Sequence, residues 1–132
     1  MRLLLDTHVL LWLAASPERL GAATDTVADP ANELLLSAAS AWEIGIKYGN
    51  GRLQLPESPD AWLASRAPRL GVTHLPVSWQ DGVAVAGLPP LHRDPFDRLL
   101  VAQARSCGGP RSLGELLEGQ LWPVPERRSQ VP

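Results

Sequence analysis

Asp6 stands where one kind of segment in the sequence gives way to another. It follows the apolar run of residues 3–5 and precedes a helical pattern of apolar residues, so it lies at a junction of strand and helix. In open α/β sheets, ligands bind at such junctions, outside the carboxyl ends of the strands. Asp is also among the best helix N-cap residues, and a cap is the simpler interpretation of Asp6 taken alone. A chemical role depends on whether other carboxylates reach the same edge.

Glu43 is the second candidate. It lies roughly two helical turns after a second apolar strand, beside an apolar helix face that carries Trp42 and Ile46. Glu43 and Lys47 also form an i,i+4 pair, whose simple interpretation is support for an exposed helix, worth a few tenths of a kcal/mol. Spacing leaves both interpretations open. A functional role is favoured because this helix is expected to start at the same sheet edge as Asp6.

A third acidic cluster opens the last confidently expected helix. Asp94 is placed as an N-cap, Pro95 occupies the first helical position, and Asp97 occupies the third, where an acid complements the helix dipole. Capping explains Asp94 without any chemistry. One cap suffices, so Asp97 can turn toward a site formed by neighbouring strand ends. Arg93 and Arg98 would offer guanidinium groups suited to phosphate.

Three separated acids, Asp6, Glu43 and Asp97, predict a hard-cation site if their side chains converge. Carboxylates suit Mg²⁺ or Mn²⁺, whereas clustering them without a metal is unfavourable through mutual repulsion. Spacing by itself does not establish convergence. His8 and His92 are alternative general bases, but we favour a structural role for both, because a metal-activated water needs no histidine.

The elements that must position these acids alternate between strand and helix. Short apolar strands are expected at residues 3–5, 33–37 and 72–75, and helices at 7–15, 17–29, 37–51 with its end at the Gly49-Asn50-Gly51 segment, 58–70, 78–88 and 94–105. This alternation predicts an α/β fold with a doubly wound parallel sheet flanked by helices. Trp12 and Trp42 lie on apolar helical faces and are expected in the core.

Composition narrows the class of protein. The chain has 132 residues, 45% of them hydrophobic, a net charge of −2 and a single cysteine. One domain over residues 1–125 is expected, with a disordered tail at 126–132. We expect no membrane span, no signal peptide and no disulfide framework, which fits a cytoplasmic protein. The charge disfavours a purely electrostatic nucleic-acid binder, but cations held by an acidic site can still engage phosphates.

Three motifs together carry a family resemblance. They are LLLDTHVLLW, LSAASAWEIGIK and HRDPFDRLLVAQA, starting at residues 3, 36 and 92. In this order and at this separation they resemble the PIN-domain ribonucleases, specifically the VapC-type toxins of bacterial toxin–antitoxin pairs. The resemblance extends over roughly residues 1–105.

The resemblance implies a PIN-like sheet, one or two Mg²⁺ or Mn²⁺ ions, and hydrolysis of RNA phosphodiester bonds. By position it assigns the first, second and third acids to Asp6, Glu43 and Asp97, and it makes Asp94 an additional metal-site acid. Thr7 matches a hydroxyl position that supports a ligand or contacts phosphate. The implied partners are RNA, a VapB-like antitoxin and a second copy in a homodimer.

The chain departs from this family after Arg105. The family pattern has an apolar strand and a fourth acid there, whereas residues 107–114 contain three glycines and a proline, which disfavours a central strand. Glu115 or Glu118 would have to replace the acid, and residues 120–124 would supply only an edge strand. A truncated or frame-altered family member would give this pattern. The alternative function is therefore a catalytically impaired relative that only binds antitoxin.

Overall fold

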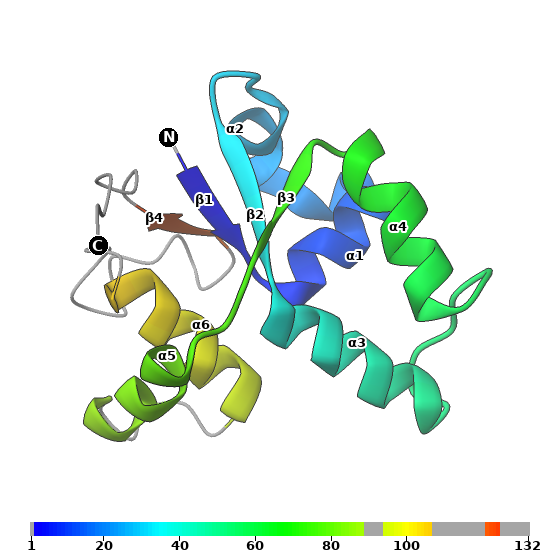
Figure 1. Ribbon diagram of the computed structural model, residues 1–132. Coiled ribbons are helices and arrows are strands. Elements are labelled where there is room, and N and C mark those ends of the chain that lie inside the picture. The colour runs from blue at the N-terminus through cyan, green and yellow to red at the C-terminus, as the bar shows by residue number, and fades with distance from the viewer. Residues whose placement is uncertain (1, 89–93, 107–120, 125–132) are drawn as a thin grey trace.

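The computed structural model describes residues 2–88, 94–106 and 121–124, and its centre is a four-stranded sheet (Figure 1). The strands are β1 (Arg2–Leu5), β2 (Glu33–Ser37), β3 (Val72–Leu75) and β4 (Leu121–Val124), in the order β3-β2-β1-β4. β1, β2 and β3 run parallel, and β4 pairs antiparallel with β1 at the edge. The predicted α/β class with a parallel sheet and a terminal edge strand is therefore confirmed.

The first two strands are short leucine runs that are buried on both faces of the sheet. Leu3 and Leu5 belong to one core cluster and Leu4 to another, because successive strand residues point to opposite faces. The same alternation places Leu35 with Leu4. Each face therefore needs its own layer of helices.

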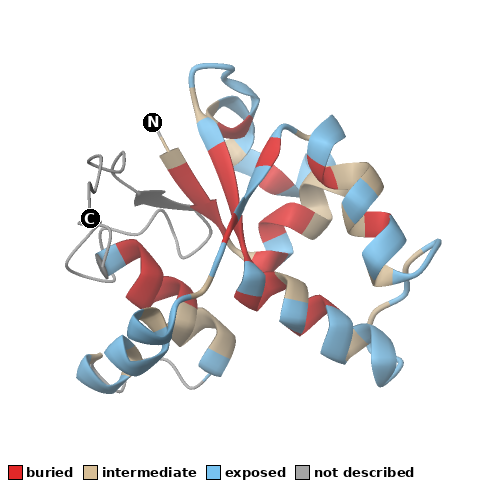
Figure 2. Ribbon diagram, in the orientation of Figure 1, coloured by how far each residue is buried: buried red, intermediate tan, exposed pale blue. Residues whose placement is uncertain are grey.

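Helices cover both faces of the sheet. One face packs against α1 (Thr7–Ala15), η1 (Pro17–Ala23), α2 (Thr24–Ala28) and α4 (Pro59–Arg69). The other packs against α6 (Pro95–Ser106), which also contacts α5 (Trp79–Ala84) and η2 (Val85–Gly87). α3 (Ala38–Gly49) leaves the carboxyl end of β2 and contributes Ala39 to one cluster and Ile44 to the other. In Figure 2 the buried residues concentrate in the strands and the inner sides of these helices.

The expected helix over residues 17–29 is wrong in one respect. Gly21, with φ +54° and ψ −122°, kinks the chain inside η1, and the segment is divided again at Thr24, where α2 begins. Positive φ is accessible to glycine without a steric penalty, which the sequence pattern of apolar positions does not reveal. The expected helix over 78–88 is likewise divided, into α5 and η2.

The expectation that Trp42 lies in the core is also wrong, since this residue is 63% exposed. The buried residues of α3 are Ala39, Ser40, Glu43 and Ile44, so the helix is rotated to turn Glu43 inward and Trp42 outward. Trp12 is half-buried and packs against the core, as expected.

Every helix in the described part of the chain is too short or too polar to cross a bilayer. Several predictions concern positions outside the described residues: Arg93, His92, Glu115 and Glu118, and the tail at 126–132.

Candidate functional site

Asp6 lies between the end of β1 and the start of α1, where the sequence placed it. Its Oδ1 accepts a hydrogen bond of 3.3 Å from the backbone N–H of His8, so Asp6 is the N-cap of α1. The side chain is only 13% exposed. A cap on an exposed helix end needs no such burial, and the capping bond uses one oxygen of the carboxylate. The cap therefore does not exclude a second role.

Burial raises the pKa of Asp6 above its ordinary value, and the negative charge of Glu43 raises it further. His8 and the backbone N–H groups at the start of α1 act in the opposite direction but are outweighed. The residue after Asp6, Thr7, is bonded to Glu43 across 36 positions of the sequence, which places Glu43 at the same corner of the fold as Asp6. Two nearby buried anions of this kind favour a proton or a cation.

Glu43 is buried, and both oxygens of its carboxylate have donors. Oε1 accepts a hydrogen bond of 2.7 Å from the hydroxyl of Thr7, and Oε2 lies 2.5 Å from Nζ of Lys47. Its side chain is 3% exposed, against 36% for Lys47. The i,i+4 pair predicted from the sequence is therefore present, but it is not the pair of an exposed helix face.

Thr7 joins α1 to α3 through a buried polar cluster. Its hydroxyl contacts Glu43 and lies 3.0 Å from the hydroxyl of Ser40, and all three residues are at most 2% exposed. Supporting a ligand residue, one of the two roles expected for Thr7, fits this contact. Its contact with phosphate stays a prediction.

Sequence reasoning did not identify Ser40. The available signal was its spacing, because Ser40 stands three residues before Glu43 and so shares its side of the helix. A small polar residue on that side indicates that the buried face of α3 is polar at this point. The same signal would have argued against burying Trp42.

The acids at the start of α6 are more exposed than Glu43. Asp94 is exposed, and its Oδ1 accepts hydrogen bonds from the backbone N–H groups of Phe96 (2.8 Å) and Asp97 (3.4 Å). The predicted cap is therefore confirmed. Asp97 is half-buried in the first turn, and Nη2 of Arg98 donates a bond of 3.2 Å to the carbonyl of Val85.

An aromatic contact brings α6 against α3 near the buried acids. The rings of Trp42 and Phe96 meet edge to face with their centroids 5.2 Å apart. Trp42 directly precedes Glu43, and Phe96 directly precedes Asp97. The two acids are thus on facing helices, whose starts are held together by this contact.

The described residues contain no group of three or more Asp, Glu, His or Cys side chains close enough to hold a metal ion. The structure joins Thr7, the residue after Asp6, to Glu43, whereas convergence of Asp6, Glu43 and Asp97 on one ion stays a prediction. The donor set nevertheless fits a divalent cation. A buried carboxylate, Glu43, and a nearly buried one, Asp6, stand beside one partly exposed ammonium group, and His8 beside Asp6 adds positive charge only when it is protonated, so carboxylates outnumber the permanent cations at this corner.

A second buried polar link holds α6 to the sheet. The hydroxyl of Ser37, at the end of β2, donates to Oε1 of Gln103 at 2.5 Å, and Nε2 of Gln103 donates to the carbonyl of Pro76 at 3.1 Å. Ser37 and Gln103 are at most 1% exposed. This link fixes α6 relative to the carboxyl ends of β2 and β3, and sequence reasoning did not find it.

The family model described as PIN domain matches residues 3–111, which include all the described helices. The chain belongs to the PIN-domain family. It is 33% identical over 105 residues to Ribonuclease VapC22 of Mycobacterium tuberculosis, covering 80% of each chain. It is 47% identical to Ribonuclease VapC16 of the same organism over 51 residues, which cover 39% of this chain and 36% of VapC16. None of the solved structures matches significantly.

The two relatives confirm the expected VapC type within the PIN-domain family. The matched range contains the candidate acids Asp6, Glu43, Asp94 and Asp97. It ends before β4, so the departure predicted after Arg105 falls largely outside it.

Proposed function

We propose that this PIN-domain protein is an endoribonuclease toxin that depends on Mg²⁺ or Mn²⁺ and is neutralised by a VapB-like antitoxin. VapC-type family membership supports the nuclease class. The observation that carries the metal dependence is the burial of Glu43, which is bonded to the residue after Asp6 at the carboxyl end of the sheet and whose negative charge raises the pKa of Asp6. Such a pair is unfavourable unless a cation compensates it.

Each residue of the site then has a separate task. Asp6 and Glu43 hold the ion together with Asp97, directly or through water. Thr7 orients the Glu43 carboxylate through its 2.7 Å bond. When bound, Mg²⁺ or Mn²⁺ neutralises charge on a phosphodiester and lowers the pKa of water.

Arg98 and Arg93 are the proposed phosphate contacts. Arg98 is fixed at the start of α6 by its bond to Val85, beside the third acid. A guanidinium group there suits a phosphate oxygen. Asp94 serves as the cap of α6 and is proposed as an outer metal-site acid only.

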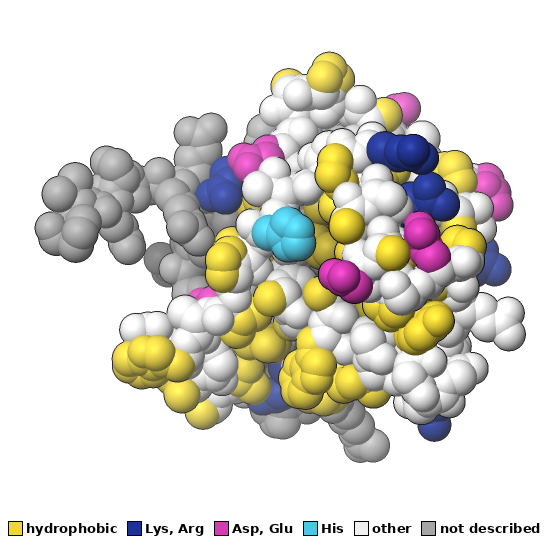
Figure 3. All heavy atoms as spheres, turned by 45° about the vertical axis from the view of Figure 1, so that its right-hand side comes forward, with side chains coloured by type: hydrophobic (Ala, Val, Ile, Leu, Met, Phe, Trp, Pro, Cys, Tyr) yellow, Lys and Arg dark blue, Asp and Glu magenta, His cyan; other side chains and the backbone are white. Residues whose placement is uncertain are grey.

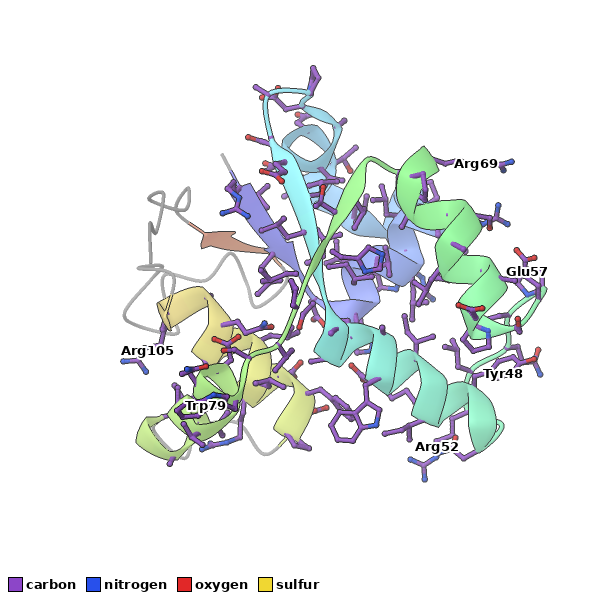
Figure 4. The ribbon with its side chains drawn as sticks, viewed as in Figure 1. Tyr48, Arg52, Glu57, Arg69, Trp79 and Arg105 are labelled. Atoms are coloured by element: carbon purple, nitrogen blue, oxygen red, sulfur yellow. The ribbon has the colours of Figure 1, made fainter. Side chains whose placement is uncertain are left out.

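The proposal places the protein in the cytoplasm, where it binds the antitoxin and a second copy in a homodimer. Exposed apolar side chains support the binding of partners. Large exposed hydrophobic residues are found on α3 and α5: Trp42, Ile46, Tyr48, Trp79 and Val83. Figure 3 shows hydrophobic side chains gathered along the lower edge of the molecule, and Figure 4 shows Trp79 and Tyr48 at its surface. Exposed apolar patches mark interaction sites, and the groups on α3 and on α5 are each a candidate.

The second candidate function is antitoxin binding without catalysis. It is favoured by the same apolar residues, together with the finding that the described residues hold no group of three metal ligands. Under this alternative the acids have only structural roles, and the protein cleaves no RNA, with or without Mn²⁺ and with or without the Asp6 carboxylate.

The deciding experiment incubates the purified protein with structured RNA and Mn²⁺, with and without EDTA. The proposal predicts cleavage that EDTA stops and that Asp6→Asn abolishes, while the circular dichroism spectrum of the variant stays that of the wild type. Cleavage at the wild-type rate by Asp6→Asn would contradict the site. Cleavage that EDTA does not stop would contradict the metal dependence and indicate a contaminating nuclease.

A further inference from the structure

The ammonium group of Lys47 reaches from the surface to the buried carboxylate of Glu43. Nζ lies 2.5 Å from Oε2, and the side chains are 36% and 3% exposed. Thr7 occupies the other oxygen, Oε1. The carboxylate is therefore held by two donors from two helices, one of them neutral and one charged.

The two donors differ in how easily they can leave. Thr7 is buried on the first turn of α1, and its short, β-branched side chain is restricted in χ1. Lys47 has a flexible four-carbon stem, and its head group is already partly in water. The ammonium group can thus withdraw toward solvent without any movement of the backbone of α3.

Asp6 makes the charge of this corner unbalanced. Asp6 directly precedes Thr7, whose hydroxyl is bonded to Glu43 at 2.7 Å, and the negative charge of Glu43 acts on Asp6. Lys47 supplies one positive charge beside two carboxylates, and His8, whose Nδ1 lies 3.7 Å from Oδ1 of Asp6, supplies a second only when it is protonated. A divalent cation brings the charge that the corner lacks, but it also meets the ammonium group as a like charge.

We propose that Lys47 is the internal counter-ion of the metal-free site, which holds Glu43 in position until a divalent cation competes for the same carboxylate. This inference rests on the proposed function, since it requires the acids to bind a metal ion. Lys47 is a positioning residue and touches neither substrate nor product. Replacement of Lys47 must lower the stability of the metal-free protein and increase its affinity for a divalent cation.

The alternative is a pair that only supports the helix. An i,i+4 Glu–Lys pair stabilises α3 to a small extent whether or not a metal ion binds. In that case the loss of Lys47 would lower the stability slightly and leave the affinity for cations unchanged. The two interpretations therefore differ in whether the loss of Lys47 lowers the dissociation constant for a cation or leaves it unchanged.

The experiment measures the dissociation constant of Mn²⁺ for the full chain by calorimetry, without RNA. Lys47→Met should bind Mn²⁺ about 10-fold more tightly than the wild type, because a repelling charge has been removed. Lys47→Arg retains the positive charge and should bind as the wild type does. Arg69→Met removes the same charge from an exposed position on α4 that points away from the site, and should also match the wild type (Figure 4).

Thermal unfolding gives a second readout that does not depend on activity. Metal-free Lys47→Met should unfold at a lower temperature than the wild type, and Mn²⁺ should raise its Tm by more, since the cation restores the missing compensation. If Lys47→Met does not fold without metal, Lys47→Gln retains a donor to Glu43 and tests the charge alone.

The outcomes separate this inference from the function on which it rests. Wild-type protein that binds no Mn²⁺ overturns the proposed metal site, and the role of Lys47 with it. Wild-type protein that binds Mn²⁺, with equal or weaker binding by Lys47→Met and Lys47→Gln, overturns the counter-ion role alone. Tighter binding by both variants, and unchanged binding by Arg69→Met, supports it.

Discussion

The corner between α1 and α3 and the first turn of α6 hold their carboxylates in different ways. Glu43 is buried, and its Oε1 is bonded to a residue 36 positions away. Asp94 is exposed and accepts its bonds from residues two and three positions on. The fold holds Glu43, whereas a single helical turn suffices to hold Asp94. Burial and the range of the contacts thus separate a candidate ligand from a cap better than residue type does.

Asp6 combines the two situations. Its bond to the N–H of His8 is as local as those of Asp94, yet its side chain is nearly buried and is influenced by Glu43. Capping and metal binding are therefore not alternatives at this position. The distinction matters for Asp97. This residue lies in the first turn of α6, but the proposed function requires it to bind the same ion as Asp6 and Glu43.

Asp97 gives the strongest test of this difference between the two regions. If Asp97 works with Asp6 and Glu43, Asp97→Asn should lower RNA cleavage by roughly 100-fold or more, since even the partners of metal ligands are worth 10- to 100-fold. The initial rate with Mn²⁺ measures this. A rate within about 3-fold of the wild type would confine the site to the corner between α1 and α3.

Thr7 tests whether the buried corner depends on its hydrogen bonds. Thr7→Val should lower the free energy of unfolding by about 1–3 kcal/mol, because it deprives buried Glu43 of a donor. Denaturant unfolding without metal gives the value. Thr7→Ser keeps the hydroxyl and serves as the control, so an equal loss in both variants would assign the effect to packing instead.

Asp94 tests whether a carboxylate held by a single helical turn acts only as a cap. Asp94→Ala removes the cap of α6 and should cost about 1 kcal/mol of stability, whereas Asp94→Asn, which can still cap, should cost less. Both variants should cleave RNA at rates close to the wild type. A large loss of activity in Asp94→Asn at unchanged stability would show that this acid is a metal ligand as well as a cap.

The smallest expected effect is a pH dependence at Asp6. Because burial raises the pKa of Asp6, its protonated form favours the folded state. That stabilisation is present below about pH 3.9, the ordinary value, and is lost as the pH rises through the raised pKa. Metal-free Asp6→Asn should therefore gain stability relative to the wild type between about pH 4 and pH 7. Denaturant unfolding at both pH values measures this, and an unchanged or opposite difference would contradict it.

Local patterns predicted most of the elements and the caps at Asp6 and Asp94. The leucine runs of β1 and β2 are buried on both faces, and Asp94 with Pro95 marks the start of α6. The orientation of α3 was predicted wrongly, because apolar periodicity favoured burying Trp42, and the second partner of Glu43, Thr7, lies on another helix. Polar contacts between distant segments leave no periodic signal.

The same limit applies to the fixing of α6. Ser37 and Gln103 are 66 positions apart, and nothing in either segment alone indicates that they meet. Gly21 is a further case, since its positive φ is set by where the chain must turn. Convergence of side chains from separate elements is thus the part of the site that the sequence indicates only through family resemblance.

A crystal of the wild-type protein soaked in Mn²⁺ tests the central claim most directly, through the anomalous signal of the ion. We predict a peak at the carboxyl end of β1, with Asp6, Glu43 and Asp97 as its ligands, directly or through water, and with Lys47 displaced from Glu43. At a saturating concentration of Mn²⁺, a peak elsewhere or no peak would contradict the metal site.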